Sequence, residues 1–222
     1  MSSMTSEVPK PVRTHFERQV KRIQADVLRM GALVENSFWL AHQALFERNL
    51  AAAEQIARQD KQVDQLNRQI ELDCVMLIAL QSPVARDLRL LSTLMQLVRD
   101  LERIGDYAED LGEISAKLFL YPVPPYMARI RHMSDLCRAM LSMSLAALTD
   151  LDAESGLQVK VKDDAVDADY DSLYELLAHQ TDIQGSVEPI LLLVLVIRHL
   201  ERMADHATNI GQRVAYIVTG RR

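Results

Sequence analysis

One short phrase occurs twice in this chain and constrains its fold more than any other feature. Leu-Glu-Arg-Ile-Gly-Asp spans residues 101–106 and Leu-Glu-Arg-Met-Ala-Asp spans residues 200–205, so the two copies lie 99 residues apart. In both copies an arginine precedes the glutamate by three residues and a glycine follows the aspartate by six. An internal repeat with this spacing predicts that the 222-residue chain folds as two similar units, one for each copy.

Apolar residues recur with the three- and four-residue spacing of helices along nearly the whole chain. Three prolines within residues 121–126 prevent a continuous helix there and divide the chain in two. We therefore predict an all-α fold of two tandem antiparallel three-helix bundles, residues 14–119 and 126–218, after a flexible N-terminus of residues 1–13. The six predicted helices cover about 14–47, 49–80, 83–118, 126–150, 157–181 and 187–218.

Each copy of the repeated phrase carries two acidic side chains four residues apart, which places them on one face of a helix. They are Glu102 and Asp106 in the first copy and Glu201 and Asp205 in the second. Two neighbouring carboxylates repel each other unless a positive group holds them together. Because both copies keep the pair, the pattern indicates a bound cation or a cationic partner.

The preceding helix of each unit carries a second acidic pair with the same spacing. These pairs are Asp60 with Asp64 and Asp163 with Asp167. Residues equally distant from the turn of an antiparallel helical hairpin face each other. In the first unit the paired positions lie 19 and 23 residues to either side of Pro83, and in the second they lie 17 and 21 residues to either side of Gln184. The sequence therefore predicts four facing carboxylates in each unit.

Four carboxylates without a thiol form a hard site, suited to Mg²⁺, Mn²⁺, Ca²⁺ or iron. The acidic row continues to Asp110 in the first unit and to Asn209 in the second, so the two sites are expected to differ by one charge. At 100° per residue, the acidic positions of the third helix fall roughly 130–220° from its buried seam, which places the metal on the bundle surface. The alternative is a solvated acidic face, neutralised in part by Arg99 and Arg198.

Charge and composition exclude several other functions. The net charge of −6 argues against nucleic-acid binding, and the most apolar run, residues 190–197, is far too short to span a bilayer. The sequence contains no glycine-rich phosphate loop, no catalytic triad pattern and no signal peptide. Cys74 and Cys137 are interpreted as buried reduced thiols of a cytosolic protein. His206, beside Asp205, is close enough in sequence to reach the second site, but we expect it at the surface or behind the metal ligands.

The doubled phrase, together with Asp60-x-x-Val-Asp64 and Arg86-Asp-Leu-Arg89, resembles the PhoU family of phosphate-signalling proteins over about residues 14–218. The resemblance implies two three-helix bundles with multinuclear metal clusters on the paired acidic motifs, usually of iron or another divalent ion. It also implies a cytoplasmic protein, often a homodimer, that is not an enzyme. The implied ligands are Asp60, Asp64, Glu102 and Asp106 in one site and Asp163, Asp167, Glu201 and Asp205 in the other.

The resemblance also implies a function. Members of the family repress the phosphate-starvation response and are thought to link a phosphate-importing ABC transporter to a sensor histidine kinase. We therefore expect a metal-binding adaptor, holding iron, Zn, Mn, Mg or Ca, whose partners are the transporter ATPase subunit and the kinase, without direct membrane insertion. The alternatives are a two-metal hydrolase of phosphate esters and a helical adaptor without metal.

Overall fold

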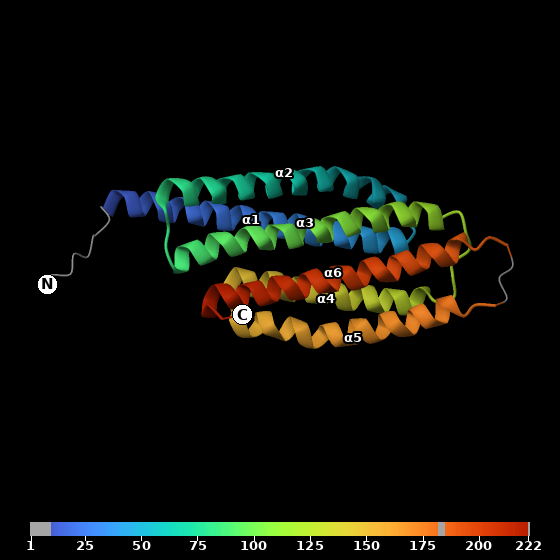
Figure 1. Cartoon of the computed structure of the whole chain (residues 1–222). Helices are drawn as coiled ribbons and strands as arrows, with labels where there is room; N and C mark the ends of the chain where they lie inside the picture. Colours follow the sequence, from blue (N-terminus) through green and yellow to red (C-terminus); the bar gives the residue numbers. More distant parts are fainter. Residues whose placement is uncertain (1–9, 182–184, 222) are drawn as a thin grey trace.

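The computed structural model describes residues 10–181 and 185–221 and consists of long helices joined by short loops (Figure 1). The helices are α1 (Lys10–Phe46), α2 (Leu50–Gln81), α3 (Arg86–Leu118), α4 (Met127–Asp150), α5 (Ala153–Ala178) and α6 (Glu188–Thr219). The predicted all-α fold is confirmed, and no described residue belongs to a β-strand. Residues 10–13 begin α1 rather than a flexible tail, whereas residues 1–9 and Gln184 lie outside the described residues.

The six helices form two three-helix bundles, α1–α3 and α4–α6, as the repeat predicts. Within each bundle all three helices contact one another, and the bundles pack side by side through α3 against α6 and α1 against α4. Figure 1 shows α2 and α5 along opposite long edges of the molecule, with the other four helices between them. The buried apolar side chains of both bundles form one continuous core, so the two repeats are structurally joined.

Helix boundaries follow local capping chemistry. Asn49 caps α2, because its side-chain oxygen accepts a hydrogen bond from the backbone N–H of Ala52. Asp152 caps α5 by accepting hydrogen bonds from the backbone N–H groups of Glu154 and Ser155. This cap starts α5 at Ala153, four residues earlier than predicted, and places Gly156 inside the helix rather than in a loop.

Gly156 instead permits an unusually close approach of two helices. A Cβ atom on Gly156 would lie 2.5 Å from the carbonyl oxygen of Gly211 on α6, and a Cβ atom on Gly211 would lie 2.2 Å from the carbonyl oxygen of Gly156. The backbones of α5 and α6 therefore touch at this point. In the first bundle, Gly112 occupies the position that corresponds to Gly211. It faces Ala53 and the side chain of Ile56 instead of a second glycine, so α2 and α3 are held further apart.

The seam of α3 is apolar and buried along most of its length. Its fully or nearly buried side chains are Leu94, Leu97, Leu101, Ile104, Ala108, Leu111, Ser115 and Leu118. Their three- and four-residue spacing is the pattern that predicted the helix. Across the described part of the chain, no helix combines the length and the apolar character needed to cross a lipid bilayer.

Candidate metal centres

The first bundle brings carboxylates of α2 and α3 together, as the counting from Pro83 predicts. One oxygen from each of Asp60, Asp64 and Asp106 lies within 4.8 Å of the other two. Glu102, one turn before Asp106 on α3, shares this side of the helix, and its carboxylate lies 3.6 Å from Nε of Arg103. We call these four residues the first cluster.

Like charges and partial burial disfavour the ionised carboxylates of the first cluster. Burial raises the pKa of Asp106 to about 6, followed by the charge of Glu102 and by smaller effects of Asp60 and Asp64, although Arg103 opposes the shift. Burial and then the charge of Asp64 also raise the pKa of Asp60. A cation held between these side chains would relieve both effects, because it would favour the ionised form of each carboxylate.

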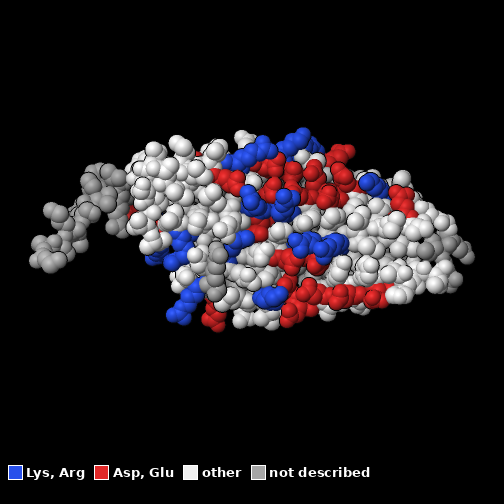
Figure 2. Space-filling model, in the orientation of Figure 1, with Lys and Arg blue, Asp and Glu red and all other residues white. Residues whose placement is uncertain are grey.

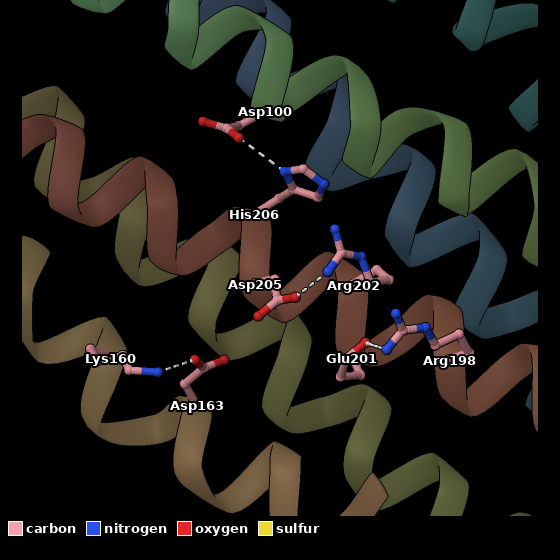
Figure 3. Close-up of polar contacts among 8 residues, drawn as sticks. All are labelled: Asp100, Lys160, Asp163, Arg198, Glu201, Arg202, Asp205 and His206. Atoms are coloured by element: carbon pink, nitrogen blue, oxygen red, sulfur yellow. Dashed lines mark hydrogen bonds and ion pairs between the residues drawn. The ribbon is translucent and has the colours of Figure 1, made fainter.

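The second bundle presents the equivalent residues of α5 and α6, which we call the second cluster: Asp163, Asp167, Glu201 and Asp205. Figure 3 shows Asp163 on α5 pointing toward α6, from which Glu201 and Asp205 project. The pKa of Asp167 is raised mainly by burial and then by the charges of Asp163 and Asp205. The pKa of Glu201 is raised mainly by burial and then by the charge of Asp205. The carboxylates of the second cluster thus affect one another, but three oxygens within 4.8 Å of one another occur, among the described residues, only in the first cluster.

Basic side chains from the same helices neutralise part of each cluster. In the second cluster, Lys160 Nζ lies 2.7 Å from an oxygen of Asp163 (Figure 3). Arg198 lies 2.8 Å from Glu201, and Arg202 lies 2.8 Å from Asp205. In the first cluster the partners are Arg68, 2.7 Å from Asp64, and Arg103, 3.2 Å from Asp106. The expected pairing of Arg198 is thus observed, whereas Arg99 reaches Glu71 on α2 at 3.5 Å instead of Glu102.

Two carboxylate oxygens in the clusters are left without a partner. Oδ1 of Asp60 and Oδ1 of Asp163 are buried, and neither has a hydrogen-bond partner among the described residues. The two residues occupy equivalent positions in the two repeats, and Asp163 is only 3% exposed. A buried acceptor without a donor is unfavourable and requires an explanation. A hard cation bound at each cluster would supply one, because the all-oxygen donor sets suit such an ion.

The location of the clusters differs in one respect from the sequence prediction of a surface site. Figure 2 shows acidic side chains gathered midway along one face, over both bundles, with basic side chains beside them. Most cluster residues are half-buried, because the neighbouring helix of the hairpin covers them, while Asp167 is exposed and Asp163 is buried. The clusters therefore lie at the surface between paired helices, with most of their side chains partly exposed.

Three further candidates lie away from the clusters, at the contact between α3 and α6. Asp110 is half exposed, with an oxygen 3.8 Å from Nε2 of His199, and Asn209 lines a groove at the other end of this contact. His206 Nδ1 donates to Oδ1 of the buried Asp100 at 2.9 Å, as Figure 3 shows. His206 thus joins the two repeats.

Sequence reasoning missed one acidic residue beside the first cluster. Burial is the largest cause that raises the pKa of Glu109, and the charge of Asp60 is the second largest. The charges of Glu113 and the other neighbouring carboxylates have smaller effects. Its counterpart in the second repeat is Thr208, whose Oγ1 is buried without a hydrogen-bond partner among the described residues. Helical geometry could have found Glu109, because a residue seven positions after Glu102 is rotated by only about 20° from it.

Fold and sites together define a class of protein: a helical tandem repeat in which each repeat holds a carboxylate cluster between its second and third helices. The model of the PhoU domain matches the chain twice, over residues 27–115 and 130–214, once in each bundle. The chain belongs to the PhoU family.

Individual relatives agree with this assignment over nearly the full length. A phosphate-specific transport system accessory protein PhoU homolog of Synechocystis sp. is 58% identical over 221 residues, which cover 100% of this chain and 99% of the relative. The crystal structure of PhoU from Pseudomonas aeruginosa superimposes with a TM-score of 0.89 at 32% identity, covering 93% of this chain and 100% of that one. The regulatory protein PhoU of the phosphate transport system from Streptococcus pneumoniae gives a TM-score of 0.85 at 29% identity.

Proposed function

We propose that this protein is a metal-binding regulator of phosphate uptake and of the phosphate-starvation response. Membership of the PhoU family and relatives named as accessory or regulatory proteins of phosphate transport support the biological role. The relatives' names describe no catalytic activity, which agrees with a regulatory protein rather than an enzyme.

The metal-binding part of the proposal depends on one observation above all: the unpartnered buried oxygens of Asp60 and Asp163 at equivalent positions of the two clusters. The first cluster would hold its ion through Asp60, Asp64, Glu102 and Asp106, with Glu109 nearby. The second would use Asp163, Asp167, Glu201 and Asp205. Oxygen donors favour Mg²⁺, Mn²⁺, Ca²⁺ or iron over softer ions. When bound, the metal would neutralise the clusters and fix the α2–α3 and α5–α6 faces in one charge state.

The proposed partners are the ATPase subunit of a phosphate-importing ABC transporter and a sensor histidine kinase. In this account the protein is a cytoplasmic homodimer that docks on both, without inserting into the membrane. A partly exposed, metal-loaded face suits docking because its charge depends on metal occupancy, and charge complementarity governs which partner approaches.

The test of the adaptor role is a pull-down with tagged protein from cells grown in abundant phosphate. We expect recovery of the transporter ATPase or the kinase, and severalfold lower recovery with the combined substitution Asp106→Asn and Asp205→Asn. Asp110→Asn, which changes an acidic residue outside the clusters, is the matched control and should behave as the unmodified protein. Reproducible recovery of neither partner would exclude the adaptor role.

A metal-dependent phosphate-ester hydrolase is the second candidate, favoured by the close grouping of Asp60, Asp64 and Asp106. Assays of metal-loaded protein on a panel of phosphate esters separate the two functions. A regulator should show no turnover above background. Turnover that disappears in Asp106→Asn but persists in Asp110→Asn would favour the hydrolase.

A further inference from the structure

A groove lies between the two repeats, away from both carboxylate clusters. It is about 760 Å³ in volume and is lined by α3, the beginning of α5 and the C-terminal part of α6. A groove of this size is in the range that accommodates small organic ligands. Its lining includes Gln96, Asn209, Gln212, Arg213, Tyr216 and Arg221. Neither the metal clusters nor the proposed docking role uses these side chains.

The groove is basic within an acidic protein. Arg213, on its wall, is fixed by Asp100 and Gln96. Arg221 lines the groove beyond the end of α6, and it forms no ion pair with a described residue. Asp100, the carboxylate that pairs with Arg213, is also engaged by His206.

A third guanidinium stands behind Tyr216. The Cζ atom of Arg89 lies 6.0 Å from the centroid of the Tyr216 ring. Arg89 packs against Gly220, because a Cβ atom there would lie 2.5 Å from its Nη1 atom. Its Nε is buried without a hydrogen-bond partner among the described residues, and no described carboxylate pairs with it. Arg89 and Arg221 therefore leave positive charge without a described counterion at this end of the groove.

We propose that this groove binds a nucleoside phosphate. Guanidinium groups match phosphate oxygens in charge and in planar geometry. Arg221, which lines the groove, would contact the phosphate, and the positive charge of Arg89 behind Tyr216 would add to the attraction. The Tyr216 ring offers a face for stacking a base, and the amides of Gln96, Asn209 and Gln212 can donate to and accept from its edges. Inorganic phosphate would fill only a small part of 760 Å³, which favours the larger ligand.

The proposal is tested by isothermal titration calorimetry of the full-length protein in EDTA, so that metal-bound nucleotide cannot associate with the carboxylate clusters. The probes are ATP, ADP, AMP and GTP, with inorganic phosphate and pyrophosphate in parallel. We expect saturable binding of at least one nucleotide, weakened roughly ten- to one-hundredfold by Arg221→Gln and by Gln212→Glu, which adds a repelling charge. Both positions are exposed, so these variants should fold.

Arg18→Gln, which removes an exposed arginine of α1 outside the groove, is the matched control and should bind as the unmodified protein does. Three results would overturn the proposal: no nucleotide binding at millimolar concentration, nucleotide binding that neither groove variant weakens, or binding of phosphate and pyrophosphate as tight as that of the nucleotides. None of these results depends on whether the clusters bind metal or the protein docks on a transporter.

Discussion

Replacing Gly211 with alanine should lower the free energy of unfolding by about 3 kcal/mol, because the new methyl group has no space. Its Cβ atom would lie 2.2 Å from the carbonyl oxygen of Gly156, and a backbone atom of a packed helix cannot turn aside as a side chain can. α5 must therefore move away from α6, which loosens the contact that also holds the second cluster. Urea unfolding of metal-free protein, followed by circular dichroism, measures the change.

The matched control is Gly112→Ala, at the corresponding position of the first repeat. There the Cβ atom would lie 3.1 Å from Cδ1 of Ile56, the end of a flexible side chain. The gain in helix propensity, about 1 kcal/mol, offsets this mild crowding. We expect a change within about 1 kcal/mol in either direction. Equal effects of the two substitutions would contradict the backbone contact between α5 and α6.

Replacing Asp100 with alanine should also be strongly destabilising, by about 2–4 kcal/mol, because it removes the buried acceptor that joins the repeats. Asp100, on α3, is 5% exposed and accepts hydrogen bonds from His206 and Arg213 of α6. Without it, Nδ1 of His206 and Nε of Arg213, both partly buried, lose their acceptor. Because the contact links the bundles, unfolding of the variant should also become less cooperative, which scanning calorimetry would detect as a broadened transition.

Asp110→Ala serves as the comparison for Asp100→Ala. Asp110 also faces α6 from α3, but it is half exposed and its nearest cation candidate, His199, is 3.8 Å away. Exposed pairs of this kind contribute about 0–1 kcal/mol, so this substitution should change stability little. If Asp110→Ala were as harmful as Asp100→Ala, burial of the Asp100 contact could not be the cause.

Much of the architecture could be predicted because both halves of the chain carry the same sequence patterns. The spacing of apolar residues gave six helices, and the prolines near residue 123 separated the bundles. Counting outward from Pro83 correctly paired α2 with α3, since a short turn leaves an antiparallel hairpin little freedom of register. The predicted break at residues 151–156 includes Gly156, because a glycine that breaks a helix and one that admits a neighbouring helix look alike in sequence. Only the backbone of α6 distinguishes them.

The candidate site was predicted in outline, and helical angles explain the differences. Residues four positions apart are rotated by about 40°, so Asp106 stays beside Glu102 on the side of α3 that faces α2. A further four positions bring the rotation to about 80°, which turns Asp110 toward α6. Asn209 is rotated by the same angle from Glu201, because it also lies eight residues further along its helix. The buried contact of Asp100 with His206 could not be foreseen, because it joins residues 106 positions apart in different repeats.

Metal binding is the central claim, and elemental analysis combined with titration tests it most directly. Protein loaded with Mn²⁺ or Fe²⁺ and then dialysed should retain at least one ion per repeat. The combined substitution Asp60→Asn and Asp106→Asn should abolish binding in the first repeat, the combination Asp163→Asn and Asp205→Asn should abolish it in the second, and Asp110→Asn should change neither. A chain that retains no stoichiometric ion, or that retains the same amount in all of these variants, would contradict the account.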